Sequence, residues 1–126
     1  METQKYSNRA NANSQQIIRN TSDKVCLATK KLTLSNTAQA LNFSGIQIGD
    51  VGSVIIKVKK AGSPTDSTHL VRYTMVDTDA PTTTHGMWYG DGDVFEVSNN
   101  KNVIGLKLIA AELGIFSILS IEYYGM

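Results

Sequence analysis

The run SVIIKVKK at residues 53–60 alternates apolar and polar side chains with a period of two. Its first face holds Val54, Ile56 and Val58, and its second face holds Ile55, Lys57 and Lys59. This alternation is typical of an antiparallel strand that buries one face and exposes the other. The pattern therefore predicts a half-buried strand.

Similar runs rich in Val, Ile, Leu, Thr and Tyr surround this strand and are separated by turn residues. They are residues 25–34, 38–43, 68–76, 93–98, 103–111 and 115–124. In the last run, Leu119, Ile121 and Tyr123 share one face. No βαβ alternation is present, so we predict an all-β fold, an antiparallel β-sandwich or jelly-roll-like barrel, formed by one domain over residues 25–126.

Residues 1–24 have a different composition, rich in Asn, Gln, Ser and Thr. Their large apolar side chains after Met1 are Tyr6, Ile17 and Ile18. Such a segment buries too little apolar surface to offset its ordering entropy by itself. We predict an extended N-terminal arm that orders on a neighbouring subunit.

The charges are unevenly distributed along the chain. Residues 1–60 carry nine Lys and Arg against three acidic residues, and residues 61–126 carry three against eight. Like copies could therefore pack basic surface on acidic surface. The N-terminus has no apolar signal-peptide core, and no segment reaches the roughly 20 apolar residues of a membrane helix, so we expect neither secretion nor a membrane partner.

The only cysteine, Cys26, excludes an internal disulfide and a cysteine zinc cluster. We expect it to be a buried thiol that acts as a small apolar residue.

Acidic residues and a histidine crowd into the stretch at 70–97, where they resemble metal ligands or acid–base groups. They are Asp77, Asp79, His85, Asp91 and Asp93. The spacing departs from a calcium loop after the first two acids, and no HExxH, GxSxG or phosphate-loop motif is present. The sequence favours turn chemistry for these acids, and a surface or half-buried polar role for His85 and His69. We expect no catalytic residues, no metal and no cofactor.

The lysines at 30, 31, 57, 59 and 60 are the best case for a nucleic-acid surface. A platform for single strands needs aromatic side chains beside the charge, and the aromatic residues lie elsewhere. We expect a solvated lysine face and no direct contact with nucleic acid.

The run Met87-Trp88-Tyr89 must point at least one large side chain outward if it is extended. Exposed Trp and Met are anchors that protein interfaces favour. The alternative is that Trp88 fills the core of the sandwich.

An ordered series of short motifs across about Leu27 to Tyr124 resembles small β-sandwich virion structural proteins of tailed bacteriophages. The series is VRY (71–73), APT (80–82), Gly86, GD (92–93), FEV (95–97), IGLKLI (104–109) and ILSIEYY (118–124). Ala80 stands where the family commonly has a glycine.

The resemblance implies a non-enzymatic component of the phage virion, of the head-decoration or neck-associated type. It would be made in the host cytoplasm and would attach to or cement the head or neck through contacts with its own copies and other virion proteins. The interface residues we expect are Tyr6, Arg9, Ile17, Ile18, Arg19, Met87, Trp88 and Tyr89.

Two other functions stay open at this point. A carbohydrate- or receptor-binding module of a tail or fibre would use Trp88 and Tyr89 with the acidic loops around Asp77 and Asp91, and would need Trp88 exposed beside those acids. An enzyme would need His85 within hydrogen-bond reach of two carboxylates in a concave pocket.

Overall fold

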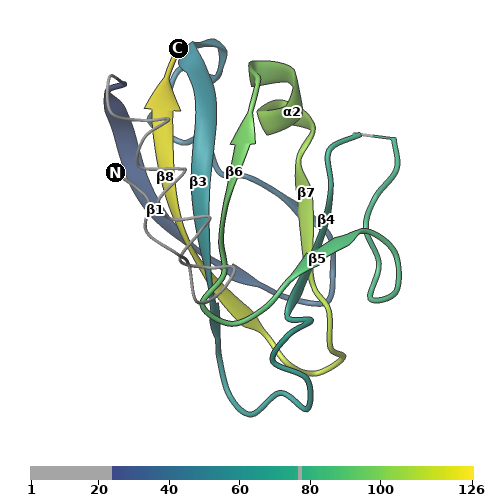
Figure 1. Cartoon of the computed structure of the whole chain (residues 1–126). Coiled ribbons are helices and arrows are strands. Elements are labelled where there is room, and N and C mark those ends of the chain that lie inside the picture. Colours follow the sequence, from purple (N-terminus) through teal and green to yellow (C-terminus); the bar gives the residue numbers. More distant parts are fainter. Residues whose placement is uncertain (1–23, 77) are drawn as a thin grey trace, which may run out of the picture.

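A computed structural model of the chain describes residues 24–76 and 78–126, and these residues form a β-sandwich of two antiparallel sheets (Figure 1). The first sheet has the order β1 (Cys26–Leu34), β8 (Ser117–Gly125), β3 (Val51–Lys60), β6 (Val94–Ser98). The second has the order β2 (Gln39–Ala40), β7 (Lys107–Ala110), β4 (Val71–Thr74), β5 (Met87–Tyr89). The predicted all-β antiparallel sandwich is confirmed.

The central strands of the first sheet, β3 and β8, supply much of the core. Val54, Ile56 and Val58 are fully buried, as the alternation at 53–60 predicts. In β8, Leu119, Ile121 and Tyr123 are buried in the same way. The opposite face of β3 carries the exposed Lys57 and Lys59, as the alternation predicts.

Three aromatic rings join the two sheets at the side of the sandwich where β5 and β6 lie. Tyr89 of β5 stacks on Phe95 of β6 with ring centroids 4.2 Å apart, and Phe95 stacks on Tyr73 of β4 at 5.2 Å. Burial of such rings contributes strongly to a small core. The inward direction of Tyr89 forces its neighbour Trp88 to the outer face of the second sheet, because side chains alternate along a strand.

The run at 103–111, predicted as one strand, is a helix followed by a strand. Helix α2 (Asn100–Gly105) precedes β7, and Asn99 begins it with φ 78° and a side chain that accepts a hydrogen bond from the Lys101 amide at 3.0 Å. Val103 in the helix is as fully buried as Leu108 in the strand. A continuous apolar run does not distinguish a buried helix from a buried strand, so the prediction of a single strand was wrong.

The prediction that Cys26 is buried was also wrong. Cys26 is exposed, because it lies at the first position of the edge strand β1, whose only buried residue is Leu34 at the other end. Its thiol makes a long contact of 3.6 Å to the carbonyl oxygen of Ala28.

The two ends of the described chain meet. The Gly125 amide donates to the carbonyl oxygen of Val25 at 3.0 Å, so the last strand runs beside the first.

The predicted arm and its interface residues lie outside the described residues, and their roles stay predictions. Those residues are Tyr6, Arg9, Ile17, Ile18 and Arg19. Within the described part of the chain, no helix is long and apolar enough to cross a membrane.

Candidate functional site

The loop before β4 and the turn after β5 are tied together at one end of the sandwich. The Asp91 amide donates to the carbonyl oxygen of Ser67 at 2.8 Å. Gly90 lies so close to the same loop that a Cβ built on it would be 2.5 Å from that oxygen. The two segments therefore form one rigid unit around Gly90.

Asp91 and Asp93 stabilise the turn between β5 and β6 through their carboxylates. Asp91 Oδ1 accepts a hydrogen bond from the Lys60 amide at 2.9 Å, and Asp93 Oδ2 accepts one from the Gly90 amide at 2.8 Å. These bonds confirm the predicted turn role. Each carboxylate keeps its other oxygen free of hydrogen bonds to any residue of 24–76 or 78–126.

Beside this turn is a hollow of about 380 Å³ with Trp88 in its wall. It is lined by Ser67, Thr68, Trp88, Gly90, Asp91 and Asp93. Trp88 is 37% exposed, so it does not fill the core. The structure thus brings Trp88 together with Asp91, whereas Tyr89 is half-buried against the core. Asp77, the other acid expected at such a binding site, lies outside the described residues.

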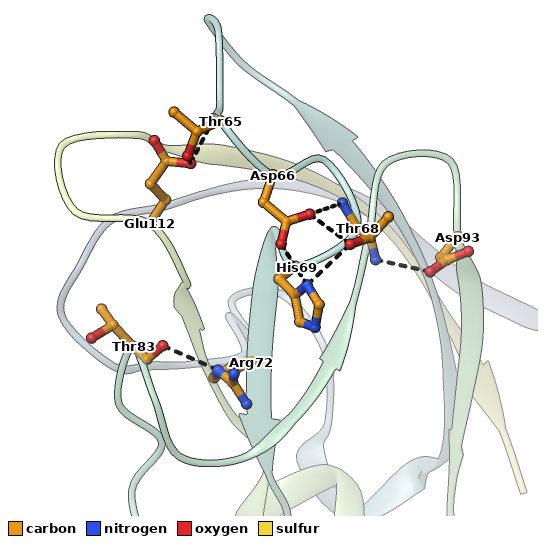
Figure 2. A network of polar contacts seen from close by, with 9 residues as sticks. Thr65, Asp66, Thr68, His69, Arg72, Thr83, Asp93 and Glu112 are labelled. Carbon is orange, nitrogen blue, oxygen red and sulfur yellow. Dashed lines mark hydrogen bonds and ion pairs between the residues drawn. The ribbon is translucent and has the colours of Figure 1, made fainter.

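The Trp88 ring is held from one side by His69, whose ring centroid is 4.0 Å away. His69 Nδ1 contacts Asp66 Oδ2 at 2.7 Å and Thr68 Oγ1 at 3.0 Å (Figure 2). The Thr68 hydroxyl and amide also donate to Asp66 Oδ1 at 2.6 and 3.0 Å. This network fixes the imidazole, and through it the indole, before any ligand arrives.

Hydrogen bonds lower the pKa of Asp66 below its ordinary value of 3.8, and the bond from the Thr68 hydroxyl is the largest cause. Because a depressed pKa means that folding favours the ionised form, the contribution of Asp66 to stability is present above pH 3.8. It is lost as the pH falls through the pKa of the folded state.

Replacing Thr68 with Ala is expected to raise the pKa of Asp66 toward 3.8, because the strongest donor to its carboxylate is removed. Carboxyl-carbon NMR across an acid titration measures this pKa. Thr65→Ala is the matched control, since the Thr65 hydroxyl donates to Glu112 at 3.0 Å and not to Asp66. An unchanged Asp66 titration in the Thr68 variant would show that the network is not formed in solution.

On the outer face of the second sheet, Arg72 holds the loop between β4 and β5. Its Nε donates to the carbonyl oxygen of Thr83 at 3.1 Å (Figure 2). Its Nη1 donates to the carbonyl oxygen of Gly86 at 2.8 Å. Gly86 has φ 120°, and a Cβ there would be 2.8 Å from the carbonyl oxygen of Tyr73. The resemblance motifs VRY, APT and Gly86 thus meet in one folded unit.

His85 lies in that same loop, exposed, and its Nε2 contacts both oxygens of the single carboxylate Asp79 at 3.0 and 3.1 Å. Next to this pair is a groove of about 370 Å³, lined by Tyr73, Thr74, Met75, Asp79, His85, Gly86 and Met87. Its rim is apolar, with Met75 40% and Met87 66% exposed. Among the described residues, Asp79 is the only carboxylate that His85 contacts.

Sequence reasoning did not find Asp66, Thr68 or the role of Arg72. The sequence Asp66-Ser67-Thr68 did indicate the contact between Asp66 and Thr68. An Asp followed two residues later by Ser or Thr is typical of a turn in which the carboxylate accepts hydrogen bonds from that later residue. Within residues 24–76 and 78–126, no three His, Cys, Asp or Glu side chains gather to hold a metal ion.

Comparisons of the chain with protein-family models, with curated proteins and with solved structures found no match.

Proposed function

We propose that this protein is a non-enzymatic structural component of a tailed-phage virion that attaches to or cements the head or neck. The order of motifs from VRY to ILSIEYY supports the class of protein. The observation that carries the attachment role is the apolar groove at the edge of the second sheet, where Met87 is two-thirds exposed.

The edge of this sheet is suited to contact with a neighbouring subunit. Strand β5 is an edge of this sheet and pairs only with β4 among the described residues. Met75, Val76 and Met87 add exposed apolar surface around the groove. A neighbouring virion protein that presents apolar side chains would bury this surface, and burial of apolar area drives association.

Attachment in this proposal depends on many weak contacts. Each copy adds modest interface area through the groove. The N-terminal arm adds further contacts, and it loses its conformational entropy only when it docks. Linked contacts raise the overall affinity well above that of each one.

Met87→Glu is expected to lower incorporation into the particle by about tenfold or more, because a charge would have to be buried in an apolar contact. Leu113→Glu is the control, since Leu113 is 76% exposed but lies outside the groove, on the loop between β7 and β8. The measurement is quantitative mass spectrometry of particles purified by density gradient.

Two outcomes would contradict the proposal. If the wild-type chain does not co-purify with the particles, the virion role is wrong. If Met87→Glu is incorporated as well as Leu113→Glu, the groove is not the attachment surface.

A further inference from the structure

The hollow beside Trp88 carries two carboxylates that have no positive partner in the described part of the chain. Neither Asp91 nor Asp93 forms an ion pair with a residue in the described ranges, and no basic side chain lines the hollow. Asp93 is half-buried. Both carboxylates line one hollow, so a cation bound there would be attracted by both.

The same hollow presents an aromatic surface that is fixed in place. Trp88 is exposed on the outer face, and the chain from Asp66 through His69 holds its orientation. A cation over an indole ring is attracted by the ring quadrupole, and Trp is the best side chain for this contact.

We propose that this hollow docks an arginine guanidinium from the N-terminal segment, residues 1–23, of a second copy of the chain. A guanidinium stacks on an aromatic ring and donates in a fork to carboxylates, and Trp88, Asp91 and Asp93 line the same hollow. This inference rests on the proposed assembly function and adds the chemistry of one contact.

A neutral sugar fits the hollow less well than a cation. Sugar hydroxyls can donate to carboxylates, and a sugar ring can lie on an indole, but a neutral ligand leaves both negative charges uncompensated. A guanidinium compensates those charges when it binds. The charge of the hollow therefore favours the cation.

The segment before β1 has the matching chemistry and the reach. Residues 5–22 contain Lys5, Arg9 and Arg19 and no acidic residue. Fully extended, 23 residues span up to about 75 Å, more than twice the roughly 33 Å of a ten-residue strand such as β3. Strand β1 and strand β6 are opposite edges of the first sheet, so a segment leaving β1 starts away from the hollow of its own copy.

Trp88 is the only tryptophan, so its fluorescence reports on the hollow directly. A synthetic peptide of residues 1–23 is titrated into the full-length chain at a concentration where light scattering shows a monomer. We expect a saturable change in emission that salt weakens. The same peptide with Arg9→Gln and Arg19→Gln should bind about tenfold more weakly or worse.

Asp91→Asn with Asp93→Asn tests the site itself. Asparagine oxygens can still accept from the Lys60 and Gly90 amides, so the turn is kept while the charge is removed. We expect this double variant to bind the peptide at least about tenfold more weakly. Asp50→Asn is the matched control, because Asp50 is exposed beside the other end of β3 and lines neither the hollow nor the groove, and it should bind as wild type does.

Several results would overturn the inference. The first is that the Asp91/Asp93 double variant binds the peptide as tightly as wild type does. The second is that neutral sugars change the Trp88 emission and the peptide does not. The third is that the emission changes with neither peptide nor protein concentration. If the wild-type chain is oligomeric at every concentration, the peptide titration is replaced by a measurement of oligomeric state. A double variant with the same oligomeric state as wild type would then overturn the inference as well. Peptide that fails to bind a chain still found in purified particles refutes the inference and leaves the proposed function standing.

Discussion

Deletion of residues 1–20 is expected to leave the sandwich folded and to lower incorporation into the particle by about two orders of magnitude. The first fully buried side chain in the described part of the chain is Leu34, so the deletion removes none of the observed core. Two linked contacts typically bind about 10²–10⁴-fold more tightly than one contact alone. Deleting the arm removes the second contact and this gain in affinity.

Thermal melting and quantitative mass spectrometry of purified particles measure the two effects separately. Arg9→Gln with Arg19→Gln is the matched comparison, because it keeps the length of the arm and removes its two arginine charges. If the truncated chain unfolds, the segment is an integral part of the sheet and the domain boundary at residue 25 is wrong. If it is incorporated normally, attachment lies in the body alone.

Gly90→Ala is expected to destabilise the fold by about 3 kcal/mol or more, the largest effect of any single methyl group that we predict. The new Cβ would meet the Ser67 carbonyl oxygen at 2.5 Å and the Thr68 Cα at 2.7 Å. Both are backbone atoms, and the Asp91 amide bond to Ser67 holds them in place. Neither segment can move without breaking that bond.

Gly92→Ala in the same turn is the control. Gly92 has φ 83° with nothing within 4 Å of a built Cβ, so its replacement costs only the left-handed backbone penalty of about 1 kcal/mol. Urea unfolding followed by circular dichroism gives both free energies of unfolding. Equal losses for the two variants would mean that the contact between Gly90 and residues 67–68 is absent in solution.

The alternating runs at 53–60 and 115–124 predicted the two central strands of the first sheet. In both, the residues assigned to one face are the residues that the structure buries. The predicted strand at 68–76 is shorter, because His69 lies in the loop that bonds Asp66 and only Val71–Thr74 pair with β7. Strand β5 was not predicted as a strand, since three residues between Gly86 and Gly90 are too few to show a period.

The residues of the hollow were only partly predictable. Trp88, Asp91 and Asp93 stand out in the sequence by residue type, near a turn. Their contact with Ser67 and Thr68 depends on two loops more than twenty residues apart that meet through the pairing of β4 with β5. No local pattern encodes such a contact, because it is a consequence of how the sheets are paired.

The hydrogen bond from Gly125 to Val25 decides where foreign sequences can be attached to this protein. A reporter or affinity tag fused after Met126 would begin beside the point where β1 starts, and would crowd any partner bound to the segment before it. The loop at 61–66 lies at the other end of the sandwich, because Lys60 pairs with Ser117 while Val51 pairs with Gly125 (Figure 1). An epitope inserted at Gly62 or Ser63, both exposed, would leave the N-terminal side clear and would make the protein a carrier for displayed peptides.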